Sequence, residues 1–166
     1  MKHQFLPLAT CALLLLAAGC KPKEEPVNPE QQNLSGNVAR PEWVAPEDYD
    51  YTSSMTAVIR VDLKAQYPTP AAEWQLSDQD MLAAFIGDEC LGVASPDDGY
   101  FYLYIASPTS NSDSGLTGEA GLISLRYYSA HYKNLFVAKD AFPFVNDAQQ
   151  GTYTAPFVPN LVVVTD

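Results

Sequence analysis

The chain has 166 residues, of which 20 are acidic and 9 are basic, and its formal net charge is −11. Such an acidic chain repels the phosphate backbone of DNA and RNA, so its composition argues against a nucleic-acid-binding protein. It also repels anionic membrane surfaces. Hydrophobic residues make up 47% of the chain, which at this length suits one domain with its own core.

The first nineteen residues have the pattern of a secretory signal peptide. Lys2 supplies the positive charge, residues 5–18 are apolar, and small residues precede Cys20. The apolar run is shorter than the roughly 20 residues that a membrane-spanning helix needs. Removal of residues 1–19 would leave 147 residues with a net charge near −12, because Lys2 leaves with them.

The end of this segment, LAAGC at residues 16–20, resembles the lipobox of bacterial lipoproteins, with Ala17 where that family prefers Leu. The resemblance implies that Cys20 carries acyl groups such as palmitate, and that these acyl groups attach the protein to the membrane. Each buried CH₂ contributes about 0.8 kcal/mol, so several acyl chains anchor stably. The sequence KEE at residues 23–25 is similar to the signal that sends Bacteroidota lipoproteins to the outer face of the outer membrane. We therefore expect cell-surface display, with a solvated charged tether as the plainer interpretation.

Residues 20–47 are rich in Pro, Glu, Gln and Asn and hold few large apolar side chains. This composition buries too little surface to offset the entropy of ordering. It predicts a lipidated, disordered linker over residues 20–47, followed by the folded domain at residues 48–166. Trp43 and Val44 lie close enough to the domain to dock on it.

The rest of the chain shows the two-residue alternation of β-strands, interrupted by Gly, Pro, Asp, Asn and Ser. Helical periodicity is not evident, and the strand spacing of roughly ten residues is typical of a sandwich. We predict an all-β fold, a single antiparallel β-sandwich of immunoglobulin-like or similar Greek-key architecture. The expected strands cover residues 56–64, 81–86, 90–94, 100–106, 122–128, 135–139, 142–145 and 161–165.

Cysteine and histidine are scarce. Cys11 leaves with the signal peptide and Cys20 takes the lipid, so Cys90 has no partner for an internal disulfide. His131 is the only histidine after the signal peptide, and nothing in its spacing points to a nucleophilic site. We do not expect an enzyme. A hydrolase is the outside alternative, because it would need two carboxylates fixed across a cleft.

Residues 81–94, MLAAFIGDECLGVA, resemble the I-A-A-F-x-G-D-E-C-R-G-x-A hairpin of a small β-sandwich module found in Bacteroidota surface and secreted proteins. YTSSMT at residues 51–56 and the predicted strands after the hairpin are similar to that module's other strands. The chain departs from the pattern at Leu91, where the module has Arg, and at Tyr128, where it has Asp or Asn. The resemblance implies no enzymatic activity and favours a display or accessory module.

One group of aromatic residues is a candidate platform for stacking on sugar rings. Tyrosines that alternate along a strand share one face of the sheet, at a spacing that suits flat ligands. The plainer interpretation is that tyrosine simply packs well on a half-exposed sheet. The candidate ligand-binding residues are Trp74, Tyr100, Tyr102, Tyr104 and Tyr128.

A group of acidic residues near the hairpin is a candidate Ca²⁺ site, because carboxylate oxygens are the ligands that Ca²⁺ prefers. There is no EF-hand spacing, and the plainer interpretation is turn residues on an acidic surface. The candidate metal ligands are Asp78, Asp80, Asp88, Glu89, Asp97 and Asp98.

Taken together, the sequence predicts a lipid-anchored surface protein with a non-catalytic binding or accessory role. Its expected partner is a carbohydrate or a surface protein. The alternative is a structural component of a surface complex or a pilus-like structure. Apart from the Ca²⁺ hypothesis, we expect no cofactor.

Overall fold

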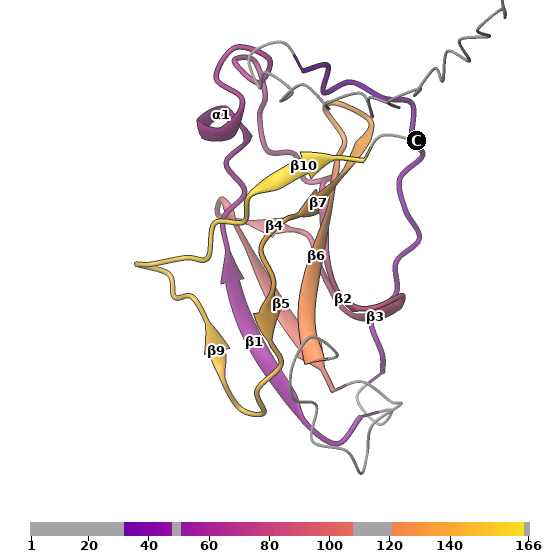
Figure 1. Ribbon diagram of the computed structural model, residues 1–166, viewed down its shortest axis with the longest axis vertical. Helices are drawn as coiled ribbons and strands as arrows, with labels where there is room; N and C mark the ends of the chain where they lie inside the picture. The colour runs from indigo at the N-terminus through magenta and orange to yellow at the C-terminus, as the bar shows by residue number, and fades with distance from the viewer. Residues whose placement is uncertain (1–31, 48–50, 108–120, 165–166) are drawn as a thin grey trace, which may run out of the picture.

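The computed structural model describes residues 32–47, 51–107 and 121–164, so the predicted signal peptide and Cys20 lie outside the described residues. Two β-sheets lie face to face, which confirms the predicted all-β sandwich (Figure 1). Within the described ranges the helix α1 (Leu63–Gln66) is a single turn. No helix in that part of the chain is long and apolar enough to cross a membrane.

The first sheet has the strand order β4-β5-β1-β9. β1 pairs antiparallel with β5 over its whole length, and parallel with the short β9 on its other side. These strands form because apolar and polar side chains alternate along β1 and β5, so each strand buries one face and exposes the other. The bounds are β1 (Ser54–Ile59), β4 (Pro96–Asp97), β5 (Tyr100–Ala106) and β9 (Gln149–Gln150).

The second sheet has the order β10-β7-β6-β2-β3, and the short β8 pairs with β6 outside this path. The ladders between these described strands are antiparallel, and β2 lies between β6 and β3, as expected for a strand that is apolar on both faces. The bounds are β2 (Met81–Ile86), β3 (Glu89–Ala94), β6 (Leu122–Ser129), β7 (Asn134–Ala138), β8 (Phe142–Pro143) and β10 (Leu161–Val163).

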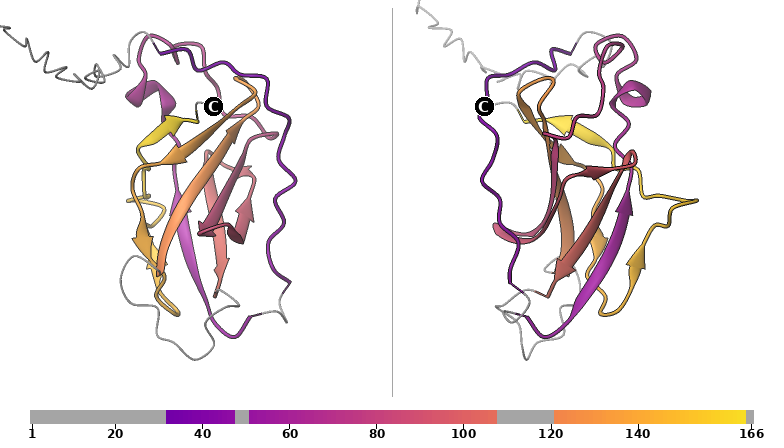
Figure 2. Two further views of the ribbon diagram at one scale, coloured as in Figure 1. Left: turned by 45° about the vertical axis from the view of Figure 1, so that its right-hand side comes forward. Right: turned by 180° about the vertical axis from the view of Figure 1, so that it is seen from behind.

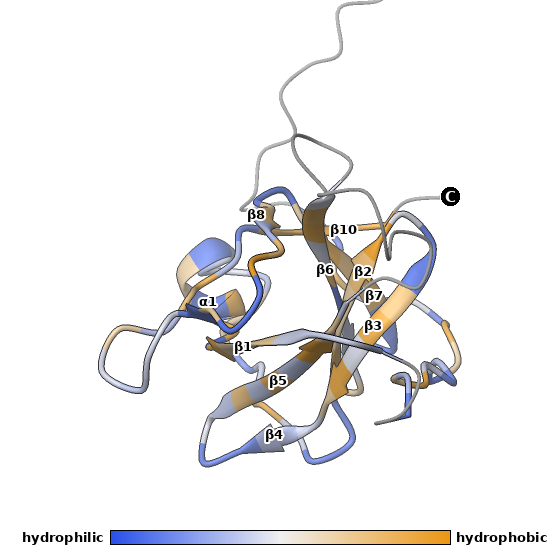
Figure 3. Cartoon of the chain, turned by 90° about the horizontal axis from the view of Figure 1, so that it is seen from below, coloured by the Kyte–Doolittle hydropathy of each residue, from blue (hydrophilic) through white to orange (hydrophobic). Residues whose placement is uncertain are grey.

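The core lies between the two sheets. Phe101 of β5 meets Tyr127 of β6 edge-on, with ring centroids 6.0 Å apart, and Tyr127 contacts Phe136 of β7 at 5.8 Å. All three rings are fully buried. Seen end-on in Figure 3, β5 shows bands of alternating hydropathy, because its inward residues are apolar and its outward residues are tyrosines. The core therefore fixes which face of β5 points to solvent.

The strand predicted at residues 56–64 ends earlier, at Ile59. The Asp62 side chain accepts a hydrogen bond from the Ala65 backbone N–H at 3.0 Å and so caps the first turn of α1. A capping aspartate favours a helix start over a continued strand, and the alternation that runs through to Leu63 conceals this. The sequence also did not predict β4 and β9, which are two residues each.

Residues 32–47, called the N-terminal strap below, lie along the outer face of the second sheet (Figure 2). The Gly36 N–H donates to the Tyr132 carbonyl at 2.9 Å, and the Val38 N–H donates to the Lys133 carbonyl at 2.8 Å. Leu34 is only 2% exposed and joins the core. These contacts tie the strap to the turn between β6 and β7.

At its other end the strap places Trp43 edge-on against Phe85 of β2, with ring centroids 5.8 Å apart. The expected docking of Trp43 is therefore present, whereas Val44 remains 76% exposed. The expectation of a disordered linker up to residue 47 is wrong for residues 32–47. Leu34 and Trp43 bury apolar surface, and backbone N–H groups of the strap find hydrogen-bond acceptors in the domain. Together these contacts offset the entropy cost of ordering the strap, which its polar composition alone does not reveal.

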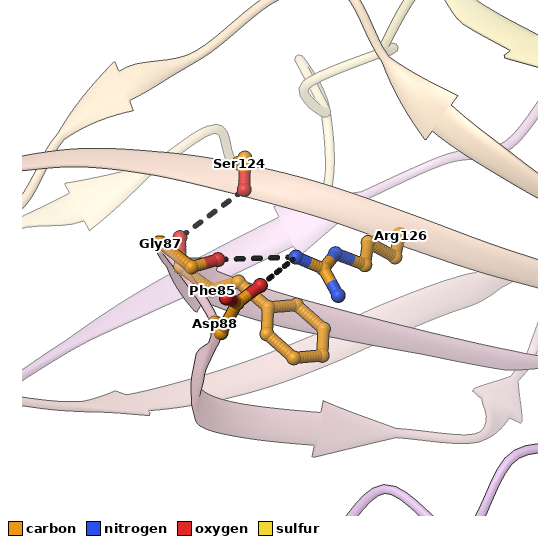
Figure 4. Close-up of polar contacts among 5 residues, drawn as sticks. All are labelled: Phe85, Gly87, Asp88, Ser124 and Arg126. Carbon is orange, nitrogen blue, oxygen red and sulfur yellow. Dashed lines mark hydrogen bonds and ion pairs between the residues drawn. The ribbon is translucent and has the colours of Figure 1, made fainter.

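The G-D-E turn of the β2–β3 hairpin is held to β6 by Arg126 (Figure 4). The Arg126 guanidinium lies 4.0 Å from the centroid of the Phe85 ring, donates to the Gly87 carbonyl at 3.0 Å and pairs with Asp88 at 3.4 Å. The Ser124 hydroxyl donates to the Phe85 carbonyl at 3.4 Å. Phe85 thus contacts both Arg126 and Trp43, and these residues of the hairpin motif have a structural role.

The two sheets approach each other closely where β3 passes β5. A Cβ atom added to Gly92 would lie 2.3 Å from the Tyr104 carbonyl oxygen, well inside any real contact. The β2–β3 ladder is irregular at this point, with a register shift between Ala84 and Phe85. Glycine at position 92 is therefore required for the approach that sets the position of β5 and its outward side chains.

Candidate ligand-binding face

The outward face of β5 carries three tyrosines. Tyr100 is half-buried, Tyr102 is 42% exposed and Tyr104 is 52% exposed, whereas Phe101 and Leu103 between them are buried. In the β1–β5 register, Tyr102 lies opposite Val58 and Tyr104 opposite Thr56, so these β1 residues share the same outer face. The predicted stripe of alternating tyrosines is confirmed for these three residues.

Two further tyrosines extend the stripe at its ends. Tyr153 contacts Tyr100 with ring centroids 5.0 Å apart, and Tyr51 contacts Tyr104 at 5.9 Å. Tyr100 and Tyr102 are 6.2 Å apart. We call this set the tyrosine face, and its members are Tyr51, Tyr100, Tyr102, Tyr104 and Tyr153.

Sequence reasoning missed Tyr51 and Tyr153 as site residues. Tyr51 precedes β1, and Tyr153 lies in the loop after Gly151, so neither belongs to the alternating strand pattern. Gly151 has a φ of 71° and sits where a Cβ would lie 2.6 Å from the Val58 carbonyl oxygen, which brings this loop against β1. No local sequence signal places Tyr153 beside Tyr100, since that contact depends on the tertiary fold.

The tyrosine face is long, and a hydrogen bond holds the ring at one of its ends. From Tyr100 to Tyr104 the strand rises about 14 Å, at about 3.4 Å per residue. At one end the Ser54 hydroxyl donates to the Tyr104 hydroxyl at 2.7 Å, which holds that ring in place. Tyrosine offers a large, stiff contact area that loses little conformational entropy on binding. The face is therefore suited to an elongated ligand with apolar surfaces and hydroxyl groups.

One end of this face is acidic. Asp97 pairs with Tyr100 in the β4–β5 register, and Asp98 follows it in the left-handed conformation, with a φ of 47°. Partial desolvation raises the pKa of Tyr102, and electrostatic interaction with Tyr153, Asp97 and Asp98 raises it further. Because paired residues of an antiparallel ladder share a face, the Asp97 side chain lies on the same side of the sheet as Tyr100.

Trp74 and Tyr128 do not belong to the tyrosine face. Trp74 is 7% exposed and contributes to the core. Tyr128 is 6% exposed on the outer face of the second sheet, and its hydroxyl donates to the Val38 carbonyl of the strap at 3.4 Å. Their placement in the proposed platform is wrong, because one ring fills the sandwich and the other is covered by the strap.

The acidic residues proposed for Ca²⁺ are spread over the molecule. Asp88 pairs with Arg126, Asp78 accepts a hydrogen bond from the Ser77 hydroxyl at 3.3 Å, and Asp97 and Asp98 lie by the tyrosine face. Glu89 begins β3 at the hairpin turn. In residues 32–47, 51–107 and 121–164, no three His, Cys, Asp or Glu side chains are grouped as they would be to hold a metal ion.

Asp80 is the one fully buried acid of this set, with an exposed fraction of 0%. Its carboxylate accepts hydrogen bonds from the Ala130 N–H at 2.8 Å, the Tyr127 hydroxyl at 2.6 Å and the Ser77 N–H at 3.2 Å. Burial raises the pKa of Asp80, and the hydrogen bond from Tyr127 opposes that rise. Asp80 therefore joins the loop before β2 to the end of β6, which is a structural role.

A shallow depression of about 510 Å³ lies beside this loop, lined by Gln75, Leu76, Ser77, Asp78, Ala130 and His131. Its lining is mostly polar, whereas small-molecule sites are mostly apolar. The His131 ring stands edge-on to Tyr132, with centroids 4.7 Å apart. The depression offers fewer features of a binding site than the tyrosine face does.

No protein-family model matches the chain, and no curated protein or solved structure is significantly similar to it. The resemblance of the β2–β3 hairpin to a Bacteroidota module therefore stays a prediction.

Proposed function

We propose that the protein is a lipid-anchored, cell-surface β-sandwich that binds carbohydrate through the tyrosine face and does not catalyse a reaction. The observation that carries the proposal is the row of outward tyrosines on β5, extended by Tyr51 and Tyr153. Exposed aromatic rings in contact with one another form a larger apolar surface than scattered single residues do, and such patches mark interaction sites.

Carbohydrate is the ligand whose chemistry fits this surface. A pyranose ring has an apolar face of C–H groups that can lie on an aromatic ring, and its hydroxyls can exchange hydrogen bonds with tyrosine hydroxyls. Tyr102 and Tyr104 offer both kinds of contact, since each ring is about half exposed. A purely apolar ligand would leave these hydroxyls without partners.

The arrangement of acids supports binding rather than hydrolysis. Glycosidases hold two carboxyl groups about 5–9 Å apart on either side of the scissile bond. Here Asp97 and Asp98 are consecutive residues at one end of an open sheet face. They lie on the same side of any ligand along β5, which is unsuited to paired acid–base chemistry.

The position of the strap supports display of this face. The strap begins at the end of the domain that carries α1 and β10, while β5 runs away from that end along the opposite sheet (Figures 1 and 2). A tether that enters through the strap therefore holds the domain by the second sheet. The tyrosine face on the first sheet would remain open to polymers around the cell.

The experiment is to compare the wild-type chain with Tyr102→Ala on a panel of soluble polysaccharides by affinity gel electrophoresis. Tyr102 is at the middle of the face, so we expect at least about five-fold weaker binding, as for a central interface residue worth about 1 kcal/mol or more. Val44→Ala is the matched control, because Val44 is an exposed apolar residue on the strap. It should bind as the wild type does.

Circular dichroism and the unfolding midpoint should show that both variants are folded. A wild-type chain that binds no polysaccharide would contradict the proposal, as would equal binding by Tyr102→Ala. Co-purification with a surface protein in place of glycan binding would favour the assembly role instead.

A further inference from the structure

We infer that the ligand of the tyrosine face is an uncharged, soluble, linear polysaccharide bound in mid-chain along β5, and that Asp97 and Asp98 exclude acidic polymers. This inference rests on the proposed function and adds the ligand class. Three features carry it: the length of the face, the angles between its rings, and the charge at one end.

The length of the face favours a chain over a single sugar. The strand rises about 14 Å between Tyr100 and Tyr104, which is longer than one pyranose ring. Tyr153 and Tyr51 continue the contact surface at the two ends of the strand. Because rings lie at both ends, a polymer can enter at one end and leave at the other, so recognition does not depend on a chain terminus.

The angles between neighbouring rings favour a single soluble chain over a flat crystalline surface. The Tyr100 ring is inclined by 45° to Tyr102 and by 40° to Tyr153, and Tyr51 is inclined by 54° to Tyr104. A crystalline polysaccharide presents coplanar sugar rings, which need coplanar aromatic rings. These tilted rings instead suit a chain whose successive sugars turn relative to one another.

The charge at the Tyr100 end determines which chains are tolerated. Asp97 is paired with Tyr100 across the β4–β5 ladder, so both side chains lie on the same face of the sheet, and the exposed Asp98 follows directly. A uronate or sulfate group at this end of the face would therefore meet two like charges. Arg60 follows β1 on the same side of the sheet by alternation, but it is paired with Asp62 at 3.9 Å. The chain as a whole is strongly acidic and adds to the repulsion.

The two aspartates should lower the affinity for acidic polymers relative to neutral ones. Two unit charges about 4 Å apart in water repel enough to weaken binding by about five-fold per pair. The effect should fade as salt is raised, because the screening length is about 10 Å at 0.1 M ionic strength. Uncharged chains should show no such salt dependence.

The experiment measures binding at low salt to neutral polymers (soluble glucans, mannans, xylans and galactans) and to acidic ones (polygalacturonate and alginate). The test variant is Asp97→Asn with Asp98→Asn. Its control is Glu42→Gln with Glu73→Gln, which removes the same charge from two other exposed positions. We expect the wild type to prefer a neutral polymer. The Asp97/Asp98 variant should bind polygalacturonate or alginate about five-fold or more tightly than the wild type does.

In both double variants the affinity for neutral polymers should stay within about two-fold of the wild-type value, because asparagine and glutamine keep the shape of the side chains they replace. An equal gain in acidic binding by the Glu42/Glu73 variant would show that net charge alone acts, and would overturn the role of Asp97 and Asp98. Wild-type binding to acidic polymers as tight as to neutral ones would overturn the inference while leaving carbohydrate binding intact.

Fragments of the preferred neutral polymer test the mid-chain part. Affinity should rise from the monosaccharide through longer oligosaccharides and then level off, and insoluble crystalline cellulose should not retain the protein. Full affinity for a monosaccharide, or strong retention on crystalline cellulose, would overturn this part. Binding to no polysaccharide at all would instead mean that the proposed function itself has failed.

Discussion

Replacing Tyr127 by phenylalanine should remove one hydroxyl from a fully buried polar contact with Asp80. The Tyr127 ring lies in the core between Phe101 and Phe136, and phenylalanine can fill the same space. Its hydroxyl donates to the Asp80 carboxylate at 2.6 Å. Asp80 would keep the N–H groups of Ala130 and Ser77, the second at a longer 3.2 Å.

The expected loss of stability is about 2 kcal/mol near pH 7. A hydrogen bond to a charged group contributes about 1.5–3 kcal/mol, and the carboxylate oxygen that loses its short contact is fully buried. The matched control is Tyr104→Phe, which removes an exposed hydroxyl that accepts from Ser54 at 2.7 Å. Its effect should stay within about 0.5 kcal/mol, as for most surface substitutions.

The difference between wild type and Tyr127→Phe should shrink at alkaline pH. Burial, and then the charge of Asp80, raise the pKa of Tyr127 well above its ordinary value of 10.0. Above pH 10 the unfolded chain loses this proton while the folded chain keeps it, so stability falls as the pH rises. The slope is about 1.4 kcal/mol per pH unit for one such tyrosine, and phenylalanine lacks it.

A gap of about 2 kcal/mol should therefore close within about one and a half pH units above 10. Other tyrosines, including Tyr67 and Tyr132, whose pKa values burial also raises, are present in both chains and cancel in the comparison. The assay is urea unfolding followed by far-ultraviolet circular dichroism from pH 7 to pH 11.5. Equal stability at pH 7, or a gap that persists unchanged to pH 11.5, would refute the role given to the Tyr127–Asp80 contact.

Two further outcomes are expected. Gly92→Ala should lower the free energy of unfolding by about 3 kcal/mol, since the new Cβ would meet the Tyr104 carbonyl oxygen at 2.3 Å between the sheets. Its control, Gly87→Ala, meets no atom within 4 Å but has a φ of 60°, and should lower it by about 1–2 kcal/mol. Equal losses in thermal unfolding would count against the close approach of the two sheets at Gly92. Cys20→Ala should move the protein from the membrane to the soluble fraction of the cell, and unchanged membrane association would disprove the predicted lipid anchor.

Much of the fold follows from local pattern. Strands with strict alternation, such as β5, could be predicted with their inward and outward faces, because a period of two residues admits only one assignment once the apolar face is buried. The outward position of Tyr102 and Tyr104 follows from the same pattern. β2 was also predictable as a covered central strand, since both of its faces are apolar.

Other features depend on contacts between residues far apart in the chain. The strap is polar in composition, and its order comes from Leu34 in the core and from Trp43 on Phe85, more than 40 residues away in sequence. The burial of Trp74 and the contact of Tyr153 with Tyr100 are of the same kind. An exposed aromatic residue and a buried one look alike in a loop sequence, which is why the predicted platform had the wrong members at its margins.

Amide chemical-shift mapping tests the ligand face most directly. The chain from residue 20 onward, made as Cys20→Ala and labelled with ¹⁵N, would be titrated with a soluble neutral oligosaccharide chosen from the polysaccharide panel. We predict saturable shifts in β5 (Tyr100–Ala106), in β1 and around Tyr153, with the strap at residues 32–47 unaffected. Shifts that gather on the strap or around the depression at Ser77 and His131 would contradict binding at the tyrosine face.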